Sequence, residues 1–457
     1  MSRVFLLSAN VVTEPYPVYP LGMAVIAGAL DRVGHTLRQF DFLAADQSEE
    51  ALRAALLDFA PEVVCLSLRN IDNVDSFDGE EGWYLARTRR LTALVRETTK
   101  APLIVGGPAF SIMPEAILDY LGADCGVVGE GERVLVGLLE DWAAGRPLPR
   151  LASEPGAGLS GAEMAAPLLV PELVAFYRER SGMANLQTKR GCPFHCAYCT
   201  YPGLEGKVFR CRPPEAVVDD IERLQREHGI DQLFFTDSIF NDPAGHYLTV
   251  AEEILRRGVQ LRWSAFFRPQ GLGSPELALL KESGLYALEL GTDAASDATL
   301  AGLGKGLTFA EVEAVNRACV AARLPCAHFV IFGGPGETAA TVREGLANLA
   351  RLEQTVVFAF SGIRLLSKSP LHARAIHEGL VTADQSLLHP LYYYAPGLDR
   401  EGMNGTIEQA FHGRRDRIFP PSEGQKRMQV MQDFGFRGLL WDKLIAFDKP
   451  RRGHGRR

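Results

Sequence analysis

The sequence predicts an α/β protein built from two successive units of alternating strands and helices. Three observations lead to this fold class. The chain has 457 residues, about three times the ~150 residues expected for one domain. Hydrophobic residues make up 47% and charged residues 23%, which is ordinary globular composition. Short β-branched runs alternate with amphipathic segments on both sides of a stretch rich in Pro, Gly and Ala. We expect an N-terminal domain over 1–145, a linker over 146–184, a second domain over 185–370 and a C-terminal region over 371–457.

The first domain is predicted to hold five strands, each followed by a helix. The expected strands lie at 3–9, 36–41, 62–68, 102–105 and 125–128. The third is almost continuously apolar, which suits a parallel strand covered on both faces. Parallel neighbours need a crossover connection, so the pattern predicts a doubly wound, Rossmann-like sheet. Ligands of such sheets bind outside the carboxyl ends of the strands.

The second domain is predicted to be an incomplete barrel. Strands are expected at 186–189, 232–236, 260–267, 286–291, 327–332 and 356–363, with helical patterns between them. Six units are too few for an eight-fold barrel and predict a partial (β/α)6 barrel, with its chemistry at the carboxyl ends of the strands. Beyond residue 371 the alternation stops, and one further helix is expected over 423–447.

Composition narrows the functional classes. The net charge of −8 argues against a broad electrostatic surface for nucleic acid or anionic membranes. No window approaches the ~18 uninterrupted apolar residues of a membrane span. Eight cysteines in a chain of this length do not form a disulfide framework, and the N-terminus lacks the cleavage site of a signal peptide. We therefore expect a cytoplasmic protein.

Three cysteines lie within eight positions, directly after the first expected strand of the second domain. Cys192, Cys196 and Cys199 have the spacing C-x3-C-x2-C, which is typical of a metal site. Structural zinc would need a fourth ligand, and the nearest further cysteine is the more distant Cys211. Three thiolates instead leave one iron of a cubane cluster without a protein ligand, where a cofactor or substrate can bind.

This motif resembles the CxxxCxΦC signature of the radical S-adenosylmethionine (SAM) superfamily, with Tyr198 as the aromatic residue Φ. The resemblance implies a [4Fe–4S] cluster that chelates SAM, and an external one-electron reductant of the flavodoxin or ferredoxin type. It also implies SAM contacts at strand ends of the barrel, although the usual Gly-Gly-Glu is absent from the second strand end. The implied SAM-binding residues are Tyr198, Asp237, Ser238, Arg268 and Glu289.

A doubly wound domain before such a barrel resembles the cobalamin-binding class of the superfamily. Glycine-rich strand ends let backbone approach a flat corrin closely. No Asp-x-His-x-x-Gly follows the first strand, so the resemblance implies base-off, His-off cobalamin, with Arg69 as the candidate on the lower face of cobalt. The implied cobalamin contacts are Tyr19, Gly22, Ser67, Arg69, Asn70, Gly106, Gly107, Gly129 and Glu130.

The resemblance implies a cobalamin-dependent radical SAM methyltransferase that methylates an unactivated carbon, using a 5′-deoxyadenosyl radical and methylcobalamin. Cyclisation, ring contraction or C–C bond formation without net methyl transfer is the alternative, and a cofactor-binding regulator without turnover is a second. A tRNA methylthiotransferase is disfavoured because the first domain offers only Cys65 and Cys125. The sequence assigns no catalytic residue and leaves a small-molecule, lipid or peptide substrate open.

Overall fold

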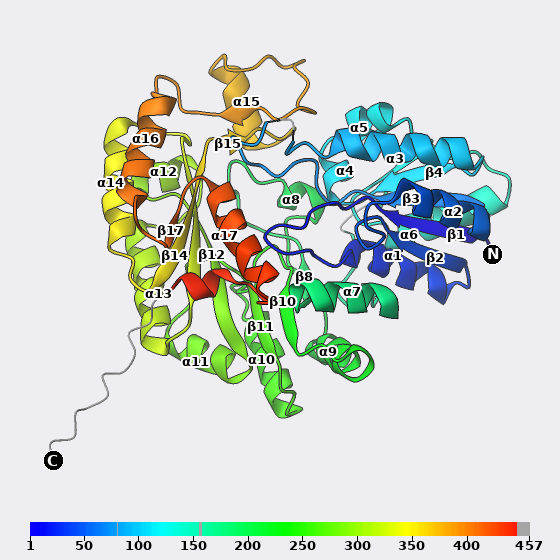
Figure 1. The fold of residues 1–457 in the computed structure, drawn as a ribbon, viewed down its shortest axis with the longest axis horizontal. Coiled ribbons are helices and arrows are strands. Elements are labelled where there is room, and N and C mark those ends of the chain that lie inside the picture. Colours follow the sequence, from blue (N-terminus) through cyan, green and yellow to red (C-terminus); the bar gives the residue numbers. More distant parts are fainter. Residues whose placement is uncertain (80, 155–157, 446–457) are drawn as a thin grey trace.

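The computed structural model describes residues 1–79, 81–154 and 158–445, and it contains two parallel sheets in adjacent domains (Figure 1). The first sheet has the order β2-β1-β3-β4-β5-β6. Its strands are β1 (Arg3–Ser8), β2 (Thr36–Asp41), β3 (Val63–Ser67), β4 (Leu103–Gly106), β5 (Cys125–Val128) and β6 (Leu151–Ser153). The order reverses beside β1, so the point where ligands bind in doubly wound folds lies between β1 and β3.

Helices cover both faces of this sheet, as the continuous burial of β1 from Val4 to Ser8 requires. Phe5 and Leu7 pack with the helices on one face, and Val4 and Leu6 with those on the other, because successive side chains of a strand point to opposite sides. The first face carries α2 (Glu49–Phe59), α3 (Leu85–Thr98), α4 (Pro108–Ile112) and α5 (Pro114–Leu121); the second carries α1 (Leu21–Arg32) and α6 (Glu132–Ala143).

The second sheet is an open, seven-stranded half-barrel with the order β17-β14-β13-β12-β11-β10-β7. Its strands are β7 (Ala184–Leu186), β10 (Gln232–Phe235), β11 (Arg262–Phe267), β12 (Leu285–Asp293), β13 (Cys326–Phe332), β14 (Thr355–Ser361) and β17 (Arg417–Ile418). The helices between them are α9 (Pro214–His228), α10 (His246–Arg256), α11 (Ser274–Glu282), α12 (Asp297–Gly302), α13 (Phe309–Ala322) and α14 (Ala339–Ala350). In the described chain β7 and β17 do not pair with each other, so the barrel is partial, as predicted.

Two short strands join the sheets from segments in which no strand was expected. β6 extends the first sheet from within 146–184, and β17 extends the second from within 371–457. Strands of two or three residues are too short for an alternating pattern to reveal them. The stretch 146–184 also holds α7 (Pro171–Ser181), and β7 is followed by the hairpin of β8 (Lys189–Arg190) and β9 (Arg210–Cys211).

The C-terminal region packs against the barrel. β15 (Ile363–Arg364) precedes this region and pairs with its strand β16 (Tyr392–Tyr393). The other elements are α15 (Pro370–His377), α16 (Arg400–Phe411), α17 (Pro421–Asp433) and a 3-10 helix (Trp441–Leu444). The helix expected over 423–447 is wrong in extent: α17 ends at Asp433 and Gly435 follows with φ +86°. The expected part beyond 445 lies outside the described residues. Met428 and Trp441 pack in one cluster with Phe358 on β14.

Buried polar contacts fix the two domains relative to each other. Arg364 on β15 forms a 2.8 Å ion pair with Asp72 of the first domain, and both side chains are buried. Arg190 pairs with Glu132 of the first domain at 2.6 Å. These contacts hold the carboxyl ends of both sheets toward a common interface (Figure 1). None of the described helices is long and apolar enough to cross a membrane.

Candidate functional site

A cavity of about 1400 Å³ lies between the carboxyl ends of the two sheets. Ser67 and Gly106 line it from the first domain, and Gln187, Thr236 and Glu289 line it from the half-barrel. Pockets for one small molecule are about 300–1,000 Å³. The cavity is therefore large enough for more than one ligand.

All nine predicted cobalamin contacts line this cavity. The chain brings together loops after β1, β3, β4 and β5, which lie at one edge of the sheet. Gly107 has φ +105°, and a Cβ there would lie 2.5 Å from the Leu68 carbonyl oxygen, so the turn requires glycine. At Gly22 the position of a Cβ has no neighbour within 4 Å. The residues are Tyr19, Gly22, Ser67, Arg69, Asn70, Gly106, Gly107, Gly129 and Glu130.

Arg69 has the properties expected of a residue that faces a large cofactor. Its Nη1 is buried and has no hydrogen-bond partner in the protein, and burial lowers the pKa of its guanidinium. An unpaired buried donor is costly, so such a group fits a site that a ligand completes. No histidine is among the described residues that line the cavity, so these residues fit a corrinoid without a histidine ligand.

Glu130 lines the cavity and also joins the two domains. Its carboxylate accepts hydrogen bonds from Arg210 at 2.9 Å and from the Leu159 amide at 2.7 Å, and it lies 3.3 Å from Arg190. Burial raises the pKa of Glu130, but the hydrogen bond from Arg210 and the further contacts outweigh it, so the net pKa is lowered. Glu130 therefore forms ion pairs between the two domains and also lines the cavity.

The three cysteines lie on one tight loop after β8. The Cys192 amide donates to the Gly206 carbonyl, and the Cys199 amide donates to the Cys196 carbonyl, each at 3.0 Å. Gly191 opens the loop with φ +91°, where a Cβ would meet a backbone carbonyl at 2.1 Å. Burial raises the pKa of each thiol, that of Cys199 to about 12.

The three thiols of the cysteine loop suit a cubane cluster. No three His, Cys, Asp or Glu side chains of the described residues converge on one point as ligands of one metal. A cubane binds each cysteine through a different iron, so convergence on one atom is not required. The nearby cations Lys305 and Arg268 lower the pKa of Cys192 and Cys196, against the effect of burial. They would offset the negative charge of bound thiolates.

Four of the predicted SAM-binding residues surround this loop. The Tyr198 hydroxyl donates to Asp293 at 2.5 Å, and Lys305 pairs with the same carboxylate at 2.6 Å. The Arg268 guanidinium lies 4.2 Å from the ring centroid of Phe194, and its Nη1 has no partner. Sequence reasoning missed Asp293 and Lys305 as members of this site, because no motif joins them to the cysteines.

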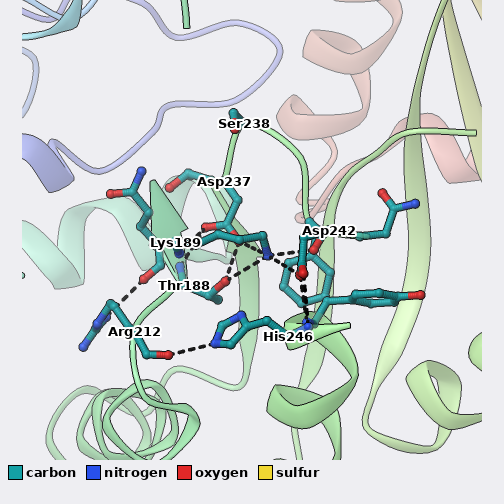
Figure 2. Close-up of polar contacts among 12 residues, drawn as sticks. Thr188, Lys189, Arg212, Asp237, Ser238, Asp242 and His246 are labelled. Carbon is teal, nitrogen blue, oxygen red and sulfur yellow. Dashed lines mark hydrogen bonds and ion pairs between the residues drawn. The ribbon is translucent and has the colours of Figure 1, made fainter. Parts of the chain in front are cut away.

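Ser238 and Asp237 lie on the two sides of the second strand end (Figure 2). The Ser238 hydroxyl donates to the Gly191 carbonyl at 2.9 Å, at the start of the cysteine loop. Asp237 points away and is fully buried, and it accepts from the Thr188 amide at 2.7 Å. The Lys189 Nζ lies 3.2 Å from Asp237. Asp237 therefore holds the base of the loop. Neither Asp237 nor Ser238 is among the described residues that line the cavity.

Lys189 is the centre of this buried network. Its Nζ donates to the Phe240 carbonyl at 2.7 Å and lies 3.6 Å from Asp242. His246 contacts the Arg212 carbonyl nearby at 2.8 Å. Lys189 stands three positions before Cys192. Its contacts with Asp237 and Asp242 anchor the start of the cysteine loop.

Glu289 lies deeper in the barrel than the other predicted SAM contacts. It lines the cavity from β12, two residues before Gly291, which is about 7 Å along a strand. The Trp441 indole N–H donates to its Oε1 at 2.9 Å. Burial raises the pKa of Glu289 to about 7, although this hydrogen bond lowers it. Trp441 was missed because it lies far away in the chain, in a region without a recognisable motif.

Comparison with known proteins gives both domains a family. Residues 7–139 match the B12 binding domain, and residues 186–347 match the radical SAM superfamily. The fold is similar to that of the radical S-adenosylmethionine methyltransferase TsrM from Kitasatospora setae, with a TM-score of 0.82 and 24% identity over 97% of both chains.

Sequence relatives include enzymes with different reactions. The chain is 26% identical to a tryptophan 2-C-methyltransferase of Streptomyces laurentii, over 77% of this chain and 71% of the relative. It is also 26% identical to an anaerobic magnesium-protoporphyrin IX monomethyl ester cyclase of Cereibacter sphaeroides, over 71% of this chain and 55% of the relative. With its two domain matches, the chain is therefore a radical SAM enzyme with an N-terminal B12-binding domain, homologous to the cobalamin-dependent radical SAM methyltransferases.

Proposed function

We propose that this enzyme transfers a methyl group from SAM, by way of cobalamin, to a carbon atom of a small molecule. One observation carries the proposal: a single cavity has the predicted cobalamin contacts on one wall and the radical SAM half-barrel on the other. A methyl carrier and an activated carbon must meet at close range and away from water. A shared chamber supplies both conditions.

The residues of the half-barrel support binding of a cluster and SAM. When bound, the [4Fe–4S] cluster and SAM supply a hydrogen-abstracting 5′-deoxyadenosyl radical, and cobalamin supplies the methyl group. Cys192, Cys196 and Cys199 would ligate three irons. Tyr198 and Arg268 would contact SAM near the loop, where the unpaired Nη1 of Arg268 can donate to a carboxylate.

Ser238 and Asp237 would act differently at the same strand end. Ser238 borders the cysteine loop, so it would contact SAM through its exposed side or keep the loop in place through Gly191. Asp237 is fully buried against Lys189 and would orient the loop without touching SAM. Glu289, which the sequence analysis assigned to SAM, lies on β12 about 7 Å deeper in the barrel than Gly291.

On the opposite wall, the cobalamin contacts would hold a base-off, His-off corrinoid. The glycine strand ends allow close backbone approach, and Arg69 would occupy the lower face of cobalt. A guanidinium cannot ligate cobalt, because it has donors and no acceptor. Its charge would instead favour the electron-rich form of the metal that accepts a methyl cation.

The partners follow from the chemistry. The cluster must receive one electron at a time, so we propose a small external reductant of the flavodoxin or ferredoxin type. The acidic net charge of −8 disfavours nucleic acid as a substrate. We propose a cytoplasmic location, because thiols such as those of Cys192, Cys196 and Cys199 stay reduced there.

A corrinoid half-reaction tests the proposal without knowledge of the substrate. Anaerobically reconstituted enzyme, loaded with cobalamin and a strong reductant, receives SAM with a deuterated methyl group. We expect deuterated methyl in the extracted corrinoid by mass spectrometry, and loss of iron from the Cys192→Ala/Cys196→Ala/Cys199→Ala variant. Cobalamin that stays bound but never acquires the label contradicts methyl transfer.

The cyclase relative keeps a second reaction in view, namely C–C bond formation without net methyl transfer. The two reactions differ in where the label goes. A methyltransferase product carries the deuterated methyl group, whereas a cyclised product contains none; 5′-deoxyadenosine forms in both. Isotope analysis of the product assigns the reaction once a substrate is found.

A further inference from the structure

A row of aromatic rings crosses the half-barrel where it lines the cavity, and one carboxylate lies beside this row. Phe234 on β10 packs edge-on against Phe266 on β11, with ring centroids 5.1 Å apart. Phe329 on β13 stacks on Phe358 of β14, also at 5.1 Å, with an interplanar angle of 8°. Phe266 and Phe329 also meet edge-on, with ring centroids 6.4 Å apart, so the four rings form one continuous row. On β12, Glu289 is the register partner of Phe266 on β11 and of Ala327 on β13, so it lies beside this row.

The rings border the cavity as well as contacting one another. All four phenylalanines and Glu289 line the cavity. Phe266 is 42% exposed although it lies inside the barrel, so part of its ring surface is open to the cavity. Large apolar rings that stay uncovered at the floor of a chamber are typical of a site for an apolar, flat ligand.

Glu289 lacks a cationic partner in the described protein. Trp441 donates to its Oε1 at 2.9 Å, and no positive charge offsets the effect of burial that raises its pKa to about 7. A buried carboxylate without a cation is unfavourable. A ligand that brings a positive charge would remove this cost, and the surrounding rings would attract the same charge through their faces.

Glu289 lies apart from the other residues that were predicted to contact SAM. On the same strand, a Cβ at Gly291 would lie 4.0 Å from the Lys305 Nζ beside the cysteine loop. Glu289 lies about 7 Å deeper along this strand, where Trp441 contacts it and packs in one cluster with Phe234 and Phe358. A molecule held there would lie between the cysteine loop and the C-terminal region.

We propose that Phe234, Phe266, Phe329 and Phe358, together with Glu289 and Trp441, form the substrate chamber, and that the substrate is a small aromatic molecule with a protonated amine. The aromatic part would stack on the rings, and the ammonium would pair with the Glu289 carboxylate. The assignment of this ligand as the methyl acceptor rests on the proposed function. Binding of the ligand to this chamber is independent of that function and can be measured without turnover.

A matched pair of probes tests the charge requirement. Phenethylamine and 2-phenylethanol have the same ring and nearly the same size, and only the first is a cation. Equilibrium dialysis against anaerobically reconstituted holoenzyme measures both without turnover. We expect phenethylamine to bind at least about tenfold more tightly, as a desolvated ammonium near rings and a carboxylate would.

Three variants separate charge from shape. Glu289→Gln keeps an acceptor for Trp441 and should remove the preference for the amine. Phe266→Leu should weaken both probes together, because it removes ring surface and no charge. Glu253→Gln, on α10 and outside the cavity, removes a carboxylate that pairs with Arg256 and should change neither affinity.

The pH dependence gives a second signature. Phenethylamine should bind best where Glu289 is ionised, so its affinity should fall as the pH drops below about 7, and Glu289→Gln should abolish this dependence. The titratable groups that interact with this carboxylate are Tyr16 and Tyr286. The charges of Arg69, and of Arg262 and Asp442, act on these two tyrosines. Raised pKa values keep both tyrosines neutral throughout this range.

The outcomes are distinct. Equal binding of the two probes, no binding of either at millimolar concentration, or a Glu289→Gln variant that loses SAM and keeps phenethylamine would each overturn the substrate chamber. The corrinoid-labelling experiment is independent, because it needs no occupant here. Its failure with a retained amine preference would refute methyl transfer and leave this site standing.

Discussion

The buried lysine below the cysteine loop gives the sharpest stability prediction. Lys189 is 1% exposed, and its Nζ lies 3.2 Å from Asp237 and 3.6 Å from Asp242, both fully buried. Lys189→Met keeps the apolar stem and removes the charge, which leaves two buried carboxylates without a cation. Loss of one partner of a buried ion pair costs about 3–5 kcal/mol, a large part of the ~5–15 kcal/mol that stabilises a typical domain.

Urea unfolding under argon, with and without the cluster, measures this loss. A second variant, Lys189→Met/Asp237→Asn, should recover part of the stability, because one unpaired charge is then gone. Arg38→Met is the matched control: its partner Asp58 is 76% exposed, so the loss should stay below about 1 kcal/mol. Iron per chain should fall in Lys189→Met as well. A loss of under 1 kcal/mol with full iron retention would refute the positioning role.

Three further predictions follow from the first domain. Arg69→His should place an imidazole at cobalt, and nitrogen hyperfine splitting in the electron paramagnetic resonance spectrum of the cob(II)alamin form would detect it. Glu130→Gln should lower the melting temperature by leaving Arg210 underpaired, at a cost of about 3 kcal/mol. Because folding lowers the pKa of Glu130 below its ordinary 4.5, its contribution should be present at neutral pH and be lost as the pH falls below that value, which urea titrations at several pH values would reveal. Gly107→Ala should cost at least about 1–3 kcal/mol and weaken corrinoid retention, since a Cβ would meet the Leu68 carbonyl.

Much of the fold was predictable because its signals are local. The alternation of apolar strands with amphipathic helices requires parallel sheets, and both sheets are present. The strand-end glycines were predictable for the same reason, and all of the residues expected to contact cobalamin line one cavity. The strands β6 and β17 were not, because two or three residues carry no period and pair only where tertiary structure brings an open sheet edge beside them.

The residues of the candidate site fall into the same two groups: those with a local sequence pattern and those joined only by tertiary contacts. The sequence alone located the cysteine loop and predicted a cluster there, because three cysteines within eight residues need no long-range contact to be recognised. Only the tertiary structure decided that Tyr198 meets Asp293, that Glu289 meets Trp441 across 152 positions, and that Asp237 turns inward to Lys189. Such pairs depend on which strand ends and which terminal segment converge in space, and side chains that far apart in the chain leave no pattern in its order.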